Sequence, residues 1–237
     1  MEIGMDFLIS DLSSRGISHA FAVTMSPLKG RESSLAERVS FGIRMHSGWG
    51  ILVAIGEAAE LLERRRVTIV DEDATGGKMP FHHAENMALA SASRFLEGYT
   101  ARCASMATAA VAQFIADLGA QKRKIAAAGI VLASGKALPA LENILASHAL
   151  IHTAEGELFR NCMRRACEVH GISVFGYPER DLFELATAGL GSGAVAQIAN
   201  AGKKLGPPWT ADHKNAALAA SLALREVKRG AARATAG

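Results

Sequence analysis

The alternation of apolar and polar positions predicts an α/β domain that begins with three successive strands. Residues 39–45 alternate apolar with polar side chains, and residues 50–55 form a nearly continuous apolar run, as expected of a strand buried on both faces. Residues 66–70 predict a third strand, which ends at an acidic stretch. Because only short segments separate these strands, we expect an antiparallel meander.

The rest of the sequence predicts helices that alternate with two short strands. Pro80 is well placed at a helix start, because its missing N–H would be unpaired there. Thr210 is a good N-cap for the last helix, which we expect to end near Val227. The other expected elements are helices up to Leu96 and at 101–118 and 147–170, strands at 130–133 and 172–177, and two Ala-rich helices separated by Gly206-Pro207-Pro208.

This order of elements limits the topology. Parallel neighbours need crossover connections, which the later strand–helix units supply. We therefore predict a mixed sheet of five strands in the order 3-2-1-4-5, with strand 2 antiparallel to its neighbours and helices on both faces.

The two ends of the sequence lack this periodicity. Residues 1–37 are rich in Ser and charge, and we expect a poorly ordered extension with one short helix near 5–12. A start codon assigned too far upstream is the alternative for this segment. Residues 38–229 form the predicted domain, and residues 230–237 are expected to be a flexible tail.

Composition narrows the class of protein. Hydrophobic residues make up 49% and charged residues 21%, which is ordinary globular composition. The net charge of +3 permits binding to a polyanion without arguing for it. The three cysteines contain no CxxC pair, which favours a reducing compartment. No window of about 18 apolar residues and no signal peptide stand out, so we expect a cytoplasmic protein that does not contact membranes.

One segment carries a resemblance to a known family. In Gly42-Ile43-Arg44-Met45-His46-Ser47-Gly48-Trp49-Gly50, two apolar strands meet at a small polar turn. The segment resembles the first hairpin of the RNase H-like superfamily, especially of RuvC-type Holliday-junction resolvases. The resemblance covers residues 39–228 and is strongest from Ile130 onward. It implies an RNase H-like sheet and a role related to nucleic acid.

The same resemblance implies a degenerate metal site. RuvC-like nucleases hold two divalent metals with four carboxylates, since hard cations prefer oxygen ligands. Carried over by position, these acids fall on Arg44, near Ser134, and on Asp212 and Asn215. Only one of the four positions keeps a carboxylate, so two-magnesium nuclease chemistry is not expected.

A second group of polar residues could rebuild a metal site. His148, His152 and Glu155 fall on one narrow face of the predicted helix at 147–170. Some RNases H carry a catalytic glutamate on the equivalent helix, so the resemblance gives that role to Glu155 or Glu157. Histidine ligands suit Zn²⁺ or Mn²⁺ better than Mg²⁺. The alternative is that these residues cap, pair or face solvent.

The hairpin residues have two interpretations. His46, Ser47 and Trp49 could contact a phosphate together with backbone amides, as the first hairpin does in actin-like ATPases of the same superfamily. The alternative is a tight turn that relies on glycine at position 48, with the tryptophan packed over the strands.

The start of the last helix also has two interpretations. Asp212, His213 and Lys214 form a polar cluster there. The helix macrodipole is a sufficient structural reason for Asp212, whereas the position of the cluster in the RuvC-like resemblance favours a functional role.

Two further polar stretches could have either a functional or a structural role. His82-His83-Ala84-Glu85 lies in an early helix turn and could face the same end of the sheet, although capping or exposure also explains it. Arg64-Arg65-Arg66 precedes the third predicted strand and is interpreted as a solvated edge that discourages strand pairing, or as a phosphate contact.

Two functional hypotheses result, and the sequence leaves open whether the protein is an enzyme. In the first, it hydrolyses a phosphodiester or phosphoanhydride; Asp212 and Glu155 hold a metal and His213 is the general base. In the second, it binds nucleic acid, a protein partner or a second copy of itself without catalysis. We favour a role related to nucleic acid and leave the activity open. Substrate contacts are assigned to Arg44, His46, Ser47, Trp49 and Lys214, and metal contacts to Asp212, Glu155, His152 and His148.

The resemblance also predicts a specific contact. We expect Arg44 to lie near Asp212, where its guanidinium group fills the space in which relatives keep a metal.

Overall fold

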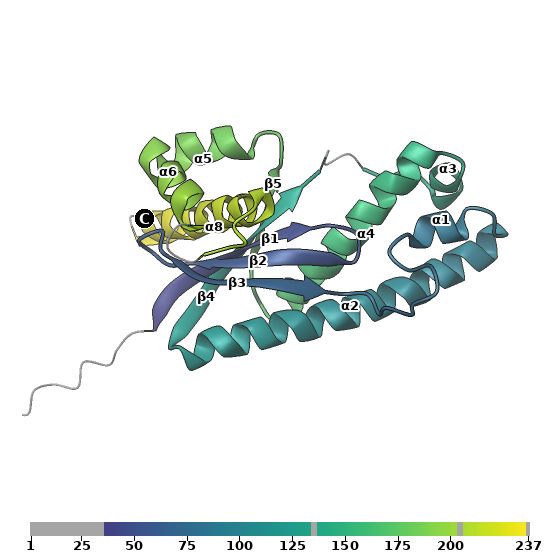
Figure 1. Cartoon of the computed structure of the whole chain (residues 1–237), viewed down its shortest axis with the longest axis horizontal. Coiled ribbons are helices and arrows are strands. Elements are labelled where there is room, and N and C mark those ends of the chain that lie inside the picture. The colour runs from purple at the N-terminus through teal and green to yellow at the C-terminus, as the bar shows by residue number, and fades with distance from the viewer. Residues whose placement is uncertain (1–35, 134–136, 203–205, 236–237) are drawn as a thin grey trace, which may run out of the picture. The chain divides into compact units, whose positions relative to one another are not determined.

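The computed structural model describes residues 36–133, 137–202 and 206–235, and its centre is one five-stranded mixed sheet (Figure 1). The strand order is β3-β2-β1-β4-β5, with β2 antiparallel to both neighbours and β1, β4 and β5 mutually parallel. The predicted RNase H-like α/β topology is thereby confirmed. The strands are β1 (Glu37–Met45), β2 (Trp49–Ile55), β3 (Leu61–Thr68), β4 (Arg123–Leu132) and β5 (Val174–Pro178).

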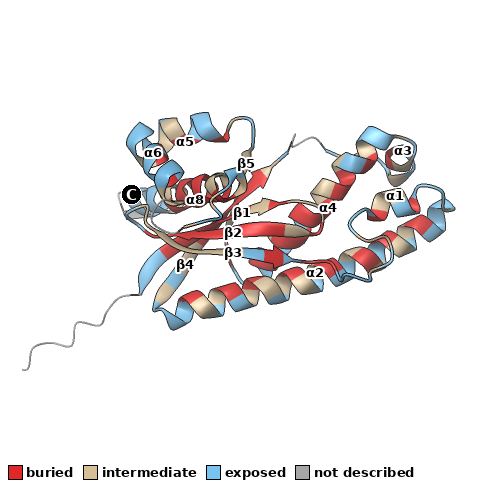
Figure 2. Cartoon of the chain, viewed as in Figure 1, coloured by how far each residue is buried: buried red, intermediate tan, exposed pale blue. Residues whose placement is uncertain are grey.

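Helices cover both faces of the sheet, as predicted (Figures 1 and 2). On one face lie α2 (Leu89–Ala120) and α4 (His148–Val169), which contact the short helices α1 (Pro80–Ala84) and α3 (Leu141–Leu145). On the other face lies α8 (Ala211–Thr235), with α5 (Leu182–Leu190) and α6 (Ser192–Asn200) packed against it.

The period-2 alternation of the strands separates two hydrophobic cores. Phe41 and Ile43 of β1 are fully buried with α2 and α4, where the Phe41 ring meets Phe114 edge-on at a centroid distance of 5.4 Å. Val53 of β2 and Val131 of β4 are buried with α8 on the opposite face. The sheet is therefore the middle of three layers.

Helix α8 lies unusually close to the central strands. A Cβ atom built on Gly42 would lie 1.7 Å from the carbonyl oxygen of Ala216, and one on Gly129 would lie 2.1 Å from that of Ala219. Ser40 of β1 donates a 2.6 Å hydrogen bond to the carbonyl oxygen of Ala220. Residues without a Cβ on the sheet and small residues on the helix thus allow direct backbone contact.

Helix α2 is long and apolar enough, by length and composition, to cross a membrane. Its most apolar window of 18 residues has a mean hydropathy of 1.3, and 28% of that window is buried. Helices α5 and α6, which are bent by 119° relative to each other, also reach the length and hydropathy of a membrane span when they are taken together. The sequence-based expectation of no such segment therefore does not hold for α2. The buried positions of α2 recur every three or four residues and include Val111 and Phe114, so this stripe packs as a core helix does.

Several elements differ from the prediction in their bounds. Strand β4 begins at Arg123, whereas the predicted strand begins at 130. Strand β3 begins at Leu61 rather than 66, because Arg64 pairs with Val53 and Arg66 with Ile51 across the β2–β3 ladder. The basic run therefore lies inside an edge strand and not before one. Helix α2 is continuous across Gly98, where the sequence predicts a break, because burial of Leu96 and Tyr99 outweighs the low helix propensity of glycine.

The chain ends also differ from the prediction. Helix α8 continues to Thr235, so residues 230–235 are helical where the sequence predicts a tail. The predicted extension at 1–37 lies almost entirely outside the described residues, as does its short helix at 5–12; Glu37 already belongs to β1.

The close contact between α8 and the sheet is tested by adding one methyl group. Gly129→Ala should lower the free energy of unfolding by about 3 kcal/mol or more, because the methyl group would overlap backbone that cannot move away. Gly230→Ala is the control: Gly230 lies in α8 with nothing within 4 Å of the added Cβ, and the substitution should stabilise the protein by about 0.5–1 kcal/mol. Urea unfolding of both variants measures the difference, and equal midpoints would contradict the contact.

Candidate functional site

The predicted contact between Arg44 and Asp212 is present at the end of β1. Arg44 Nη2 lies 3.0 Å from Glu179 Oε2, and Arg44 Nε lies 3.7 Å from Asp212 Oδ1. The third nitrogen, Nη1, donates a 2.9 Å hydrogen bond to the carbonyl oxygen of Met45. The Arg44 side chain is 17% exposed, so one guanidinium group serves as the counter-ion of two carboxylates in a largely desolvated place.

A second hydrogen-bond donor reaches the same aspartate. His46 Nε2 lies 3.0 Å from Asp212 Oδ1, and because a carboxylate only accepts, the histidine nitrogen donates. Asn215 Nδ2 donates to Glu179 Oε1 at 3.2 Å, one turn further along α8. Asp212 Oδ1 and both carboxylate oxygens of Glu179 therefore each lie beside a protein donor.

The hairpin places an aromatic row beside these charges. The rings of His46 and Trp49 are stacked, with centroids 4.3 Å apart and planes 13° apart. The Arg66 guanidinium lies 3.6 Å from the Trp49 ring centroid, a cation–π contact between neighbouring strands. Within the described residues Arg66 forms no ion pair with a carboxylate and its side chain is exposed. Arg66 is thus a cation available to a ligand.

Trp49 and Arg66 line a pocket of about 360 Å³ between β2, β3 and the start of α8. Arg64 also lies on this face and donates to the carbonyl oxygens of Gly206, Pro207 and Pro208, which ties the loop before α8 to the edge strand. Arg65 extends to the other face, where it pairs with Asp117 of α2 at 2.7 Å. The pocket walls are Trp49, Ile51, Arg64, Arg65, Arg66, Pro208, Thr210, Asp212 and His213.

His213 closes the first turn of α8. Its Nδ1 accepts a 3.3 Å hydrogen bond from the backbone N–H of Thr210 and lies 2.8 Å from the Thr210 hydroxyl, an arrangement like a capping box. Burial, and next the charge of Arg64, lower the pKa of His213, while Asp212 opposes the shift. An imidazole that accepts at Nδ1 and stays neutral is suited to capping, so His213 has a structural reason to be present.

The other predicted contacts of this site lie nearby. Ser47 and Gly48 form the turn, where His46 N–H donates to the carbonyl oxygen of Trp49 at 2.8 Å and Gly48 has φ of +76°. Lys214 lies in the first turn of α8, and its backbone N–H donates to the carbonyl oxygen of Thr210 at 3.2 Å. The predicted position near Ser134 lies outside the described residues.

Glu155 does not join Asp212. It projects from α4, on the face of the sheet opposite α8, and accepts a 2.9 Å hydrogen bond from His82 Nδ1. His148 and His152 lie beside this pair, with their Nε2 atoms 3.1 Å apart. The metal candidates predicted from the sequence therefore fall into two separate clusters. Asp212 lies beside Arg44, whereas Glu155 lies in a histidine-rich cluster with His148 and His152.

The histidine-rich cluster could hold a metal ion. One nitrogen each from His82, His148 and His152 lies within 4.8 Å of the other two. Glu157, the alternative to Glu155, is instead paired with Arg160 at 2.8 Å.

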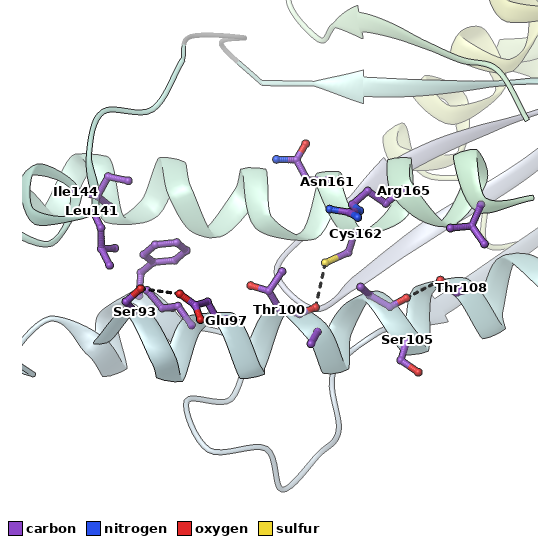
Figure 3. A pocket seen from close by; sticks show the side chains of 15 residues that line it. Ser93, Glu97, Thr100, Ser105, Thr108, Leu141, Ile144, Asn161, Cys162 and Arg165 are labelled. Carbon is purple, nitrogen blue, oxygen red and sulfur yellow. Dashed lines mark hydrogen bonds between the residues drawn. The ribbon is translucent and has the colours of Figure 1, made fainter. Parts of the chain in front are cut away.

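A larger pocket, of about 810 Å³, lies between α2 and α4 and reaches α1 and α3 (Figure 3). Its lining is mostly apolar or small, with Glu97 and Arg165 as the charged side chains among the described residues. Cys162 lines it, and burial raises the pKa of this thiol to about 12, so the sulfur is not a nucleophile near neutral pH. This pocket lacks a reactive group, and the predicted site residues lie elsewhere.

Two residues of these clusters, Glu179 and His82, were not predicted as site residues from the sequence. Glu179 follows β5 in an exposed turn and carries no motif, although it is the residue after the Tyr-Pro pair that ends the strand. His82 was noticed only as part of a helix turn, because it is 66 residues from His148.

Comparison with known proteins gives a distant resemblance. No family model matches the sequence, and no curated protein matches it. Among solved structures, T. thermophilus RuvC in complex with a Holliday junction substrate has a TM-score of 0.46 and 11% identity, over 82% of this chain and 97% of that one. The structure of Thermus thermophilus RuvC has a TM-score of 0.42 and 12% identity, over 81% and 96% respectively.

The Arg44 contacts predict a loss of stability on truncation. Arg44→Ala should lower the free energy of unfolding by about 2 kcal/mol, because Glu179 and Asp212 would face each other without their shared counter-ion. Arg180→Ala is the control, since its pair with Asp181 is 80% exposed on the arginine side and should contribute less than about 0.5 kcal/mol. Equal urea midpoints for the two variants would contradict the role of Arg44.

The lowered pKa of His213 predicts a pH dependence of stability. Its unfolded value is 6.5, so just below pH 6.5 the unfolded chain binds more protons than the folded chain. The contribution of His213 to the free energy of unfolding is therefore fully present above pH 6.5 and is lost as the pH falls below it. His213→Gln, which keeps an acceptor at the same helix position, should reduce the fall in Tm between about pH 7 and pH 5. The exposed His83→Gln should leave that fall unchanged, and identical profiles for His213→Gln and the unsubstituted protein would contradict the prediction.

Proposed function

We propose that the protein binds nucleic acid through the arginine-lined pocket and does not cleave it by a two-metal mechanism. The observation that carries this proposal is the Arg44 guanidinium between Glu179 and Asp212, at 3.0 and 3.7 Å. A divalent cation bound by these carboxylates would lie against a fixed positive charge, and both acids would first have to give up their present donors. Without such a cation, water is not activated at this place.

The chemistry of the pocket supports a polyanionic ligand. Arg66 is exposed beside Trp49, and Arg64 lines the same face of β3. Guanidinium groups are well matched to phosphate oxygens, and an aromatic side chain next to them can contact a base or sugar. The three arginines of the pocket outnumber its single carboxylate, Asp212.

The alternative, a hydrolase with a rebuilt metal site, has less support. It requires Asp212 and Glu155 to hold one ion, yet Asp212 contacts Arg44 and His46 while Glu155 contacts His82. His213, the general base of that hypothesis, uses Nδ1 to cap α8. Nucleic-acid binding without cleavage at this site needs none of these residues to move.

Binding is tested with fluorescently labelled oligonucleotides. Single-stranded, duplex and four-way-junction DNA should each bind with affinity that falls as salt rises, since phosphate contacts release counter-ions. Arg66→Ala should weaken binding several-fold and reduce the salt slope by about one. Arg94→Ala, an exposed arginine on α2 outside the pocket, is the matched control and should bind as the unsubstituted protein does.

Two results would contradict the proposal. Equal binding by the Arg66→Ala and Arg94→Ala variants would show that the pocket is not part of the nucleic-acid interface. Cleavage of any of these substrates with Mg²⁺ or Mn²⁺ that disappears in Asp212→Asn would show that the acidic edge holds catalytic metal.

A further inference from the structure

The histidine cluster on α1 and α4 is built like a metal centre and takes no part in the proposed function. His148 and His152 are one helical turn apart on α4, and their ring centroids are 4.5 Å apart. His82 comes from α1, with ring centroids 5.1 Å from His148 and 4.6 Å from His152. Three imidazoles from two helices therefore converge on one point.

The nitrogen positions are compatible with tetrahedral coordination. Zinc–nitrogen bonds of about 2.0–2.1 Å place neighbouring ligand nitrogens roughly 3.3 Å apart. The Nε2 atoms of His148 and His152 are 3.1 Å apart, and all three ligand nitrogens lie within 4.8 Å of one another. The His152 side chain is 56% exposed, so small rotations toward a shared ion are unhindered.

A buried carboxylate orients the ligand from α1. Glu155 is 3% exposed at its side chain, and its Oε1 accepts from His82 Nδ1 at 2.9 Å and from the His82 backbone N–H at 3.3 Å. Because Nδ1 carries the hydrogen, the lone pair of His82 is on Nε2, the nitrogen left to bind a metal. A carboxylate that holds a histidine in this way is the usual outer partner of a metal ligand. Glu155 Oε2 also lies 3.9 Å from His152 Nδ1.

We propose that His82, His148 and His152 bind one Zn²⁺ ion, with Glu155 as the residue that positions His82. Three neutral imidazoles favour zinc over magnesium, which prefers oxygen ligands. Three protein ligands leave a fourth position, and the exposure of His148 and His152 gives water or a small anion access to it. The ion would fasten α1 to α4 at the end of the fold where α1 and α3 lie (Figure 1).

The test is titration of the metal-free full-length protein with Zn²⁺ by calorimetry, together with thermal unfolding. We expect one Zn²⁺ per chain and a rise in Tm at saturating zinc, with no rise in Mg²⁺ at the same concentration. His148→Ala and His152→Ala should each lower the zinc affinity at least tenfold. Glu155→Gln should lower it by about 10–100-fold if this carboxylate positions His82.

Controls separate this centre from other histidines. Two variants should bind zinc as the unsubstituted protein does: His83→Ala, next to His82 but packed against Phe95, and His170→Ala, just after the end of α4. Because His148 and His152 are exposed, their alanine variants should keep the Tm of the metal-free protein. Absence of saturable 1:1 binding, or unchanged affinity in the His148→Ala/His152→Ala double variant, would overturn the proposal.

Discussion

The contact of α8 with the backbone of β1 and β4 fixes the position of the candidate site. Gly42 and Gly129 leave no space for a side chain between sheet and helix, and Ser40 bonds directly to a helix carbonyl. A helix held so closely cannot shift along the sheet without a clash. Its first turn therefore presents Asp212 to the end of β1, where Arg44 and His46 emerge.

The charges that meet at this edge support the proposal that the site binds its ligand rather than hydrolyses it. Glu179 and Asp212 would repel each other if left alone in a half-buried place, and some cation must accompany them. The chain supplies that cation itself through Arg44, which is covalently attached and cannot be exchanged for a metal. Among the three arginines of the pocket, Arg66 is the one whose side chain is exposed.

Sequence reasoning reached the topology and part of the site, for physical reasons that can be stated. The meander followed by strand–helix units leaves few ways to pair five strands, and the observed order follows. The contact of Arg44 with Asp212 depends on that topology and was predictable. The separation of Glu155 from Asp212 was not, because helical spacing shows which residues share a face without showing which layer the helix joins. Glu179 and His82 act through contacts between segments distant in sequence, which leave no local pattern.

The position of α8 along the chain has a consequence for biosynthesis. It is the last described helix, and it covers the sheet face that contains Ile51, Val53 and Val131. During translation that apolar surface lacks its main covering helix until residues 211–235 have left the ribosome. Until then the nascent chain exposes part of a hydrophobic sheet, a state that attracts chaperones and favours aggregation when they are scarce.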